Sequence, residues 1–258
     1  AEFMKKNGIL AGIKVDSGSK ELAGASGEQV TEGLDGLRER LVEYKKLGAS
    51  FAKWRAVINI GADIPSGYGI AANAHALARY AALCQEAGIV PIVEPEVIMD
   101  GSHTIERCYD VTERTLHALF EAIYAQRVRT EHLVLKASMV ISGKSCATQA
   151  SVQAVADATV LCLTRTVPAA VPGIVFLSGG QSDELATAHL SAMNAEGAKL
   201  PWPLSFSYGR ALQAPALKAW KGQTANVAAA QKALMHRAKC NSAACFGTYS
   251  AAMEKEGA

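Results

Sequence analysis

Residues 132–140 read His-Leu-Val-Leu-Lys-Ala-Ser-Met-Val, an apolar β-strand pattern that contains one lysine, Lys136. Burying a lone ammonium group is costly, so this amine must be paired with an anion, neutral, or used in chemistry. A neutral lysine amine can attack a carbonyl group and form a Schiff base. The stretch therefore predicts a strand of a buried sheet with a reactive lysine at its carboxyl end.

Similar apolar runs recur along the chain, with helical patterns between them. The predicted strands cover residues 9–15, 50–58, 89–94, 132–137, 172–178 and 203–208. The predicted helices cover residues 31–47, 71–86, 104–126, 148–166, 182–196, 210–220 and 224–239. Alternating strands and helices predict an α/β fold with a parallel sheet, and strands this apolar predict that both faces of the sheet are covered.

The spacing of these runs leaves the type of sheet open. Strands recur about every 40 residues, whereas an eight-unit barrel of about 250 residues needs one about every 31. The chain therefore holds about six βα units. A barrel and a doubly wound sheet both bind ligands beyond the carboxyl ends of their strands, so the position of charged residues there fits either fold.

The bulk composition excludes several classes of protein. Half of the 258 residues are hydrophobic and the net charge is +2, which predicts a sizeable core and gives no reason to expect nucleic acid binding. Six scattered cysteines without a CxxC pair indicate reduced thiols in a cytoplasmic protein, and no apolar run reaches membrane-spanning length. Residues 1–3, which precede Met4, are interpreted as a cloning scar, leaving residues 4–258 as a single domain.

Charged side chains gather on the predicted strands. Lys53 and Arg55 share one strand face, and so do Glu94 and Glu96, because residues i and i+2 point the same way. Two structural ion pairs are the simpler interpretation. However, four cations outnumber two carboxylates, and excess positive charge in a pocket favours an anionic ligand such as phosphate. These cations are Lys14, Lys53, Arg55 and Lys136.

Two glycine turns join late strands to the helices that follow them. The first turn contains Ser178, Gly179 and Gly180, and the second contains Ser207, Gly209 and Arg210. Free backbone N–H groups at a helix N-terminus bind phosphate, and barrel enzymes often place such a site after their last two strands. Either turn alone could be an ordinary tight turn, but two in succession predict a phosphate site.

The histidines do not predict a metal site. None of the six has metal-ligand spacing and no HExxH motif is present, so we expect neither a metal nor another cofactor. Four histidines lie on predicted helices, where surface or capping roles are expected. They are His75, His117, His189 and His236.

Seven segments together resemble the class I, Schiff-base fructose-bisphosphate aldolases, in family order and over Gly8 to about Tyr249. The segments are Gly12–Asp16, Gly33–Leu37, Phe51–Arg55, Ile89–Glu96, Leu135–Lys136, Phe176–Ser182 and Ser207–Leu212. The resemblance implies a TIM-type (β/α)8 barrel, here incomplete, that cleaves fructose 1,6-bisphosphate into dihydroxyacetone phosphate and glyceraldehyde 3-phosphate without a metal.

The resemblance also implies a role for each matched residue. Lys136 is similar to the Schiff-base nucleophile, and Glu94, supported by Glu96, to the acid/base of imine formation. Lys53 would stabilise charge near the substrate carbonyl. Further matched residues would bind substrate phosphates: Ser178, Gly179, Gly180, Ser207, Gly209 and Arg210 at one end, and Lys14 and Arg55 at the other.

The chain departs from the family pattern at both ends. The first strand of this chain matches the third strand of the family's eight-unit pattern. In the family, roughly 90 residues come before that strand and form two βα units that contain a catalytic aspartate. The family's C-terminal tail is also missing. We therefore expect imine formation to be retained, carbon–carbon cleavage to be impaired, and the gap in the barrel to be closed by rearrangement, strand exchange or homo-oligomerisation. The alternatives are a catalytically weak aldolase fragment that acts as a binding or structural module, and a metal-dependent aldolase, whose ligands this sequence lacks.

Overall fold

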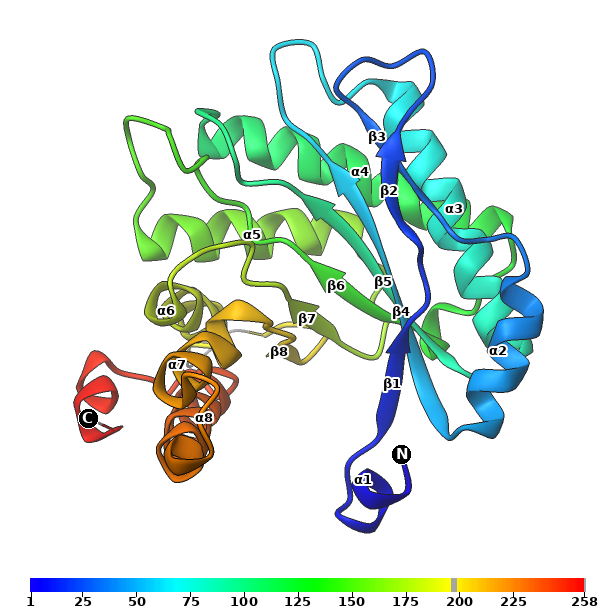
Figure 1. Cartoon of the computed structure of the whole chain (residues 1–258). Coiled ribbons are helices and arrows are strands. Elements are labelled where there is room, and N and C mark those ends of the chain that lie inside the picture. Colours follow the sequence, from blue (N-terminus) through cyan, green and yellow to red (C-terminus); the bar gives the residue numbers. More distant parts are fainter. Residues whose placement is uncertain (196–198, 258) are drawn as a thin grey trace.

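The computed structural model describes residues 1–195 and 199–257, and its central feature is a six-stranded sheet (Figure 1). All five pairings between neighbouring strands are parallel. In order across the sheet, the strands are β1 (Ala11–Lys14), β4 (Ala49–Ile58), β5 (Val90–Val97), β6 (Val134–Ala137), β7 (Ile174–Phe176) and β8 (Leu204–Phe206). The six predicted strands are thus confirmed.

Helices lie between these strands, and others precede the first strand and follow the last. The main ones are α2 (Leu37–Lys46), α3 (Gly67–Glu86), α4 (Ile105–Ala125), α5 (Val152–Thr166), α6 (Asp183–Met193), α7 (Arg210–Trp220) and α8 (Val227–Ala244). Shorter elements are α1 (Glu2–Lys6), η1 (Thr130–His132), η2 (Thr224–Asn226) and η3 (Ala251–Gly257). No helix in the described part of the chain combines the length and hydropathy needed to cross a membrane.

The strand order decides between the two folds that the sequence left open. Strands of the large sheet follow one another in chain order, without the reversal that defines a doubly wound sheet. Figure 1 shows helices α2 to α5 on one side of the curved sheet, as in a barrel wall. Within the described residues the barrel is not closed, because β1 and β8 are the two ends of the sheet and do not pair with each other.

The two faces of the sheet differ in burial. On the helix side, Trp54 of β4 stacks on Tyr80 of α3, with ring centroids 5.6 Å apart, and neither side chain is exposed. On the opposite side, Ile92, Val134 and Val175 are only partly buried. The expectation that both faces are covered is therefore wrong for the described residues, and the face that carries the charged side chains is accessible.

A hairpin replaces the start of one predicted helix. Residues 31–47 were expected to be helical, but β3 (Gln29–Glu32) pairs antiparallel with β2 (Gly18–Glu21), and α2 begins only at Leu37. Gly33 explains the break, because its φ of +123° is not helical and a Cβ there would lie 2.8 Å from the Ser17 backbone nitrogen. The hairpin is fixed to the sheet by a 2.7 Å hydrogen bond from the Thr31 hydroxyl to the Arg55 carbonyl.

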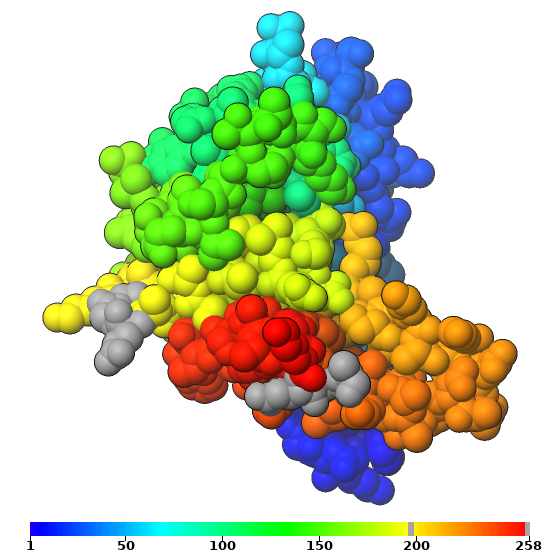
Figure 2. Space-filling model, turned by 90° about the vertical axis from the view of Figure 1, so that its left-hand side faces the viewer, coloured from blue at the N-terminus to red at the C-terminus, as the bar shows by residue number. Residues whose placement is uncertain are grey.

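The C-terminal helices form a separate layer beside α6. Figure 2 shows the orange α7–α8 region projecting from the body of the molecule, with the red C-terminal segment alongside it. The buried Arg237 of α8 donates a 2.7 Å hydrogen bond to the hydroxyl of Thr187 in α6, which in turn donates to Asn241 Oδ1 at 2.7 Å. This polar network attaches the C-terminal helices to the sheet's helical wall.

Candidate active site

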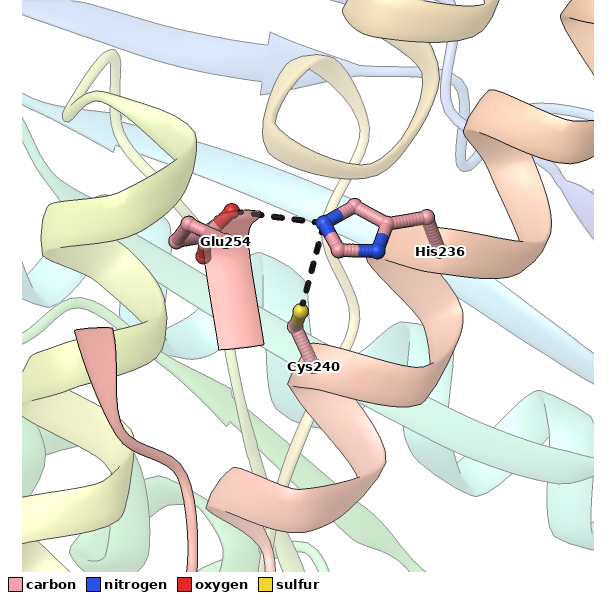
Figure 3. A group of neighbouring side chains, drawn as sticks. All are labelled: His236, Cys240 and Glu254. Atoms are coloured by element: carbon pink, nitrogen blue, oxygen red, sulfur yellow. Dashed lines mark hydrogen bonds and ion pairs between the residues drawn. The ribbon is translucent and has the colours of Figure 1, made fainter. Parts of the chain in front are cut away.

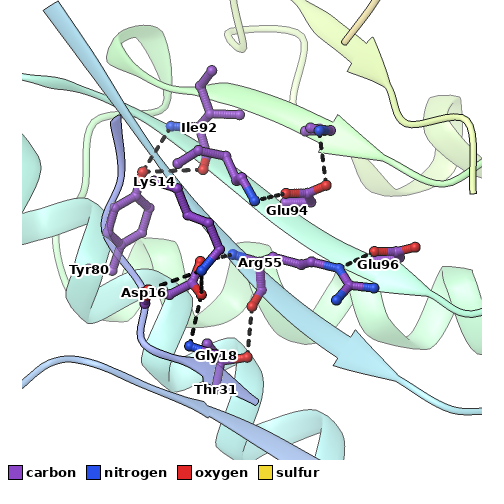
Figure 4. Close-up of polar contacts among 11 residues, drawn as sticks. Lys14, Asp16, Gly18, Thr31, Arg55, Tyr80, Ile92, Glu94 and Glu96 are labelled. Atoms are coloured by element: carbon purple, nitrogen blue, oxygen red, sulfur yellow. Dashed lines mark hydrogen bonds and ion pairs between the residues drawn. The ribbon is translucent and has the colours of Figure 1, made fainter. Parts of the chain in front are cut away.

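Three charged side chains from neighbouring strands meet on the accessible face of the sheet. Glu94 of β5 lies between Lys53 of β4 and Lys136 of β6, and Figure 4 shows its carboxylate contacted from two sides. The Lys53 Nζ atom is 2.9 Å from Glu94 Oε2, and the Lys136 Nζ atom is 3.0 Å from Glu94 Oε1. Glu94 is only 3% exposed. The parallel register therefore brings together three residues that are far apart in sequence.

This arrangement changes the electrostatics expected for Lys136. From the sequence, repulsion by Lys53 alone was expected to favour the neutral amine. In the structure a single buried carboxylate separates the two amines and offsets much of that repulsion. The cluster still carries one net positive charge. One carboxylate oxygen lies within hydrogen-bonding distance of the Lys136 amine, so a proton can pass directly between them.

Two further ion pairs lie beside this cluster. Arg55 Nε pairs with Glu96, and Lys14 Nζ pairs with Asp16 (Figure 4). Burial opposes the charged form of Arg55, but the hydrogen bond and charge of Glu96, helped by Glu94 and Asp16, raise the pKa of Arg55 above its ordinary value. The structure thus brings together all the cations predicted from the strands, each beside a carboxylate.

Asp16 is the residue of this site that the sequence interpretation missed. Its Oδ1 atom accepts a 3.1 Å hydrogen bond from the Gly18 N–H, and its Oδ2 atom accepts one of 3.2 Å from the Arg55 N–H. Its side chain is 2% exposed. Asp16 lies two residues after Lys14, so the spacing that grouped the other charges could have found it. With this third carboxylate, the predicted excess of positive charge falls to one.

The two glycine turns also lie side by side. β7 and β8 pair in parallel, and the Ser207 N–H donates a 2.8 Å hydrogen bond to the Phe176 carbonyl. Gly179 and Gly180 both have positive φ, at +60° and +94°. A Cβ at Gly180 would lie 3.4 Å from Nη2 of Arg210, so the arginine of the second turn reaches the first. Two turns predicted separately therefore form one site.

The first glycine turn is close in register to the reactive lysine. Lys136 of β6 is the partner of Val175 in β7, and the Leu177 N–H donates a 3.1 Å hydrogen bond to the Ala137 carbonyl. Ser178, which begins the turn, is 5% exposed. A buried carboxylate–lysine cluster thus lies one strand away from a cationic turn with positive-φ glycines.

Comparison with known proteins gives this geometry a family. Residues 1–258 match the family described as "Glycolytic: Fructose-bisphosphate aldolase class-I". A protein of Xanthomonas axonopodis pv. citri described as "Probable fructose-bisphosphate aldolase class 1" is 66% identical over 250 residues, which are 96% of this chain and 75% of the relative. The chain belongs to the class I fructose-bisphosphate aldolase family. Members of this family are lyases. The family resemblance inferred from seven sequence segments is therefore confirmed.

Two more relatives extend the match across kingdoms. Fructose-bisphosphate aldolase B of Gallus gallus is 53% identical, over 96% of this chain and 68% of the relative. A solved structure of fructose-bisphosphate aldolase from Plasmodium falciparum, in complex with TRAP and a small-molecule inhibitor, superposes with a TM-score of 0.94 at 47% identity. The superposition covers 96% of this chain and 72% of the Plasmodium falciparum chain. This similarity confirms the barrel-type fold. The expectation that two βα units of the family pattern precede β1 stays a prediction.

One group of potential metal ligands lies outside the lysine cluster. His236 and Cys240 of α8 approach Glu254, with His236 Nε2 3.7 Å from the cysteine sulfur and 3.5 Å from the carboxylate (Figure 3). However, Glu254 already accepts hydrogen bonds from Arg237 at 2.6 Å and Tyr249 at 2.8 Å. The guanidinium group of Arg237 therefore already offsets the charge of this carboxylate.

The structure corrects the role expected for one helical histidine. His75 and His117 are exposed as predicted, but His189 of α6 is 3% exposed. Its Nδ1 atom lies 2.6 Å from Oε1 of Gln181, the residue directly after the glycine pair. Burial lowers the pKa of His189 to about 4. His189 therefore supports the first glycine turn from behind, in its neutral form.

The low pKa of His189 predicts acid sensitivity in the range where the unfolded chain, but not the folded one, binds a proton. Because the folded pKa is depressed to about 4 from 6.5, its effect on stability is absent above pH 6.5 and grows as the pH falls toward 4. Between pH 7 and pH 5 we expect a loss of about 2 kcal/mol of unfolding free energy from this residue. Urea unfolding of the wild type and His189→Gln at both pH values measures it, and equal pH dependence in the two proteins would contradict this assignment.

Proposed function

We propose that this chain forms a Schiff base between Lys136 and the ketone carbon of a phosphorylated ketose, as a fructose-bisphosphate aldolase. The observation that carries this proposal is the position of Glu94 between the Lys136 and Lys53 amines. A nucleophile beside a carboxylate that can accept and return protons is the arrangement that imine formation requires. The family membership supports fructose 1,6-bisphosphate as substrate and dihydroxyacetone phosphate and glyceraldehyde 3-phosphate as products.

Imine formation needs several proton transfers, for which Glu94 is placed. Loss of a proton from Lys136 to Glu94 frees the lone pair on Nζ, which attacks the ketone carbon while the electron pair of the C=O π bond moves to the oxygen. The oxygen then gains a proton and the attacking nitrogen loses one, with Glu94 as the carrier, which gives a carbinolamine. A protonated Glu94 then donates to the departing hydroxyl group, which leaves as water, and the nitrogen lone pair forms the iminium. Lys53, on the other side of the same carboxylate, stabilises negative charge on the oxygen during these steps.

Cleavage follows from the iminium. The bond between C3 and C4 breaks, its electron pair moves toward the iminium nitrogen to give an enamine, and the C4 hydroxyl loses its proton as the aldehyde forms. The resemblance assigns the base for that proton to an aspartate of the family pattern. Imine formation and cleavage are distinct chemical steps, so each needs its own measurement.

The glycine turns supply a site for one substrate phosphate. We assign this role to Ser178, Gly179, Gly180, Ser207, Gly209 and Arg210, supported by the side-by-side turns and by the reach of Arg210 to Gly180. Lys14 and Arg55 are proposed for the other phosphate. Because each already pairs with a carboxylate, they would bind it more weakly than the glycine turns bind theirs.

We also propose a cytoplasmic location and self-association. Relatives from Pisum sativum and Arabidopsis thaliana are described as cytoplasmic and cytosolic aldolases, which supports the first. Self-association is supported by the unpaired outer edges of β1 and β8 and by the partly exposed face of the described sheet, since such edges favour pairing with another chain. Sedimentation velocity tests it, and a single monomeric species across concentrations would reject it.

Borohydride trapping tests the proposed chemistry. The folded chain is incubated with dihydroxyacetone phosphate and sodium borohydride, with and without EDTA, and analysed by intact mass and peptide mapping. We expect one EDTA-insensitive reduced adduct on the peptide that contains Lys136. Absence of any adduct from folded protein would reject the Schiff-base proposal and favour a binding role. Cleavage is then assayed separately with fructose 1,6-bisphosphate.

A further inference from the structure

Lys144, which lies outside the segments that carry the family resemblance, reaches the first glycine turn from a different loop. It belongs to the segment between β6 and α5. A Cβ at Gly180 would lie 3.0 Å from the Lys144 Nζ atom and 3.4 Å from Nη2 of Arg210. Two cations, one from the loop after β6 and one from the start of α7, therefore approach the same glycine.

Backbone pairing holds the Lys144 loop in this position. The Lys144 N–H donates a 2.8 Å hydrogen bond to the Met99 carbonyl, and the Ser145 N–H donates one of 2.9 Å to the Gly101 carbonyl. These bonds join the loop after β6 to the loop after β5 at the carboxyl ends of the strands. Asp100, between the two acceptors, lies 2.6 Å from the Lys144 Nζ atom through Oδ1. The backbone hydrogen bonds hold the main chain of Lys144 in place, and its ammonium group lies beside Asp100.

The charges around Gly180 are incompletely balanced. The Arg210 side chain makes no hydrogen bond or ion pair with any residue that the structure describes. Asp100, the only carboxylate paired with Lys144 among these residues, has a side chain that is 70% exposed. An exposed ion pair contributes little, so it only partly offsets the repulsion between the two cations. An anion between them would remove this repulsion.

The turn itself also offers hydrogen-bond donors. The N–H groups of Gly179 and Gly180 donate to no acceptor among the described residues, and the positive φ of both glycines leaves their backbone open. A phosphate group carries close to two negative charges at neutral pH and three strongly accepting oxygens. Two cations and two free N–H groups around one turn match that group in charge and in donors.

We propose that Lys144 is a substrate-binding residue that contacts the phosphate group at the Gly179–Gly180 turn together with Arg210. This inference rests on the proposed function, because it takes the phosphate to be that of the ketose. Lys144 touches the phosphate and not the reacting carbon, so it affects the binding of ligand and not the chemistry at Lys136.

The test compares three variants by the dihydroxyacetone phosphate concentration that gives half-maximal borohydride trapping. For Lys144→Met we expect this concentration to rise about three- to tenfold, as for loss of one partly exposed charged contact, with the maximal trapping rate unchanged. Lys144→Arg, which keeps the charge, should remain within twofold of the wild type. Asp100→Asn frees the lysine from its carboxylate and should leave the concentration unchanged or lower it.

Two controls separate phosphate binding from a structural role. Dihydroxyacetone lacks the phosphate group. The dihydroxyacetone concentration that gives half-maximal trapping should therefore be the same in the wild type and in Lys144→Met. If Lys144→Met and Asp100→Asn weaken binding alike, the ion pair is structural and the proposal is overturned. The same conclusion follows if dihydroxyacetone is affected as strongly as its phosphate.

A second measurement keeps this inference separate from the Schiff-base chemistry. Inorganic phosphate is titrated into the wild type and into Lys144→Met, and binding is followed by phosphorus NMR. Weaker phosphate binding in the variant supports the assignment even if no adduct forms on Lys136, whereas equal affinity in the two proteins overturns it. Failure of trapping in the wild type would instead reject the proposed function alone.

Discussion

Replacing Lys136 by methionine should reduce borohydride trapping of dihydroxyacetone phosphate to background. Methionine keeps the length of the unbranched side chain but offers no nucleophile, so no carbinolamine can form. Lys136→Arg is the stricter variant, because its guanidinium keeps a positive charge beside Glu94 and never loses its proton to become a nucleophile. Intact mass after trapping measures both variants against the wild type.

The matched control for this prediction is Lys53→Met. This variant removes the other amine that contacts Glu94, at a similar distance, but leaves Lys136 in place. We expect it to form the adduct on Lys136 more slowly than the wild type. An adduct on the Lys136→Met protein equal in yield to the wild type would show that another lysine is the nucleophile. Circular dichroism of all three variants checks that they fold.

Replacing Glu94 by glutamine should impair both chemistry and stability. Without the carboxylate, Lys53 and Lys136 face each other across a neutral amide, and imine formation loses its proton carrier. We expect trapping to slow by about 10²-fold or more, which is typical of loss of a general acid/base. We also expect a loss of about 2–3 kcal/mol of unfolding free energy, since removal of one partner leaves partly buried charges unpaired.

Glu96→Gln provides a control of the same chemistry two residues along the strand. Glu96 pairs with Arg55 and not with either lysine of the cluster. Its loss should slow trapping less than tenfold, an effect well below that expected for an acid/base residue. In addition, the double variant Glu94→Gln, Lys53→Met should recover part of the lost stability because only one amine then remains. Equal effects of the two glutamine substitutions would contradict the role assigned to Glu94.

Sequence patterns predicted the sheet well because each strand carries a strong local signal. The apolar runs around Trp54, Val93 and Leu135 are bounded by glycines or charged residues, and the structure places strands at each. The hairpin was missed because β2 and β3 are short, polar strands without an apolar run. A helix was expected there from the leucine spacing, but the glycines at positions 33 and 36 prevent its first turns.

The sequence predicted which residues form the candidate site, but it did not predict which of them form ion pairs with each other. Strand periodicity placed Lys53, Glu94 and Lys136 on one sheet, and the structure confirms that they meet. That one carboxylate serves both lysines depends on the register between strands, which the sequence does not specify by itself. Likewise, the burial of His189 and the approach of Lys144 to Gly180 arise from loops and helices packing across the fold, so that no local pattern signals them.

The chain order of the strands also has a consequence for how the site forms during synthesis. Lys53, Glu94 and Lys136 come from three consecutive strands, so only neighbouring segments must find each other to assemble them. These pairings join residues 41 and 42 positions apart in the chain, and no other residues of the sheet lie between the paired strands. All three lysine-cluster residues leave the ribosome before either glycine turn has been made. The chemical half of the site therefore has the opportunity to fold first, with the anion-binding half added to it as the last strands emerge.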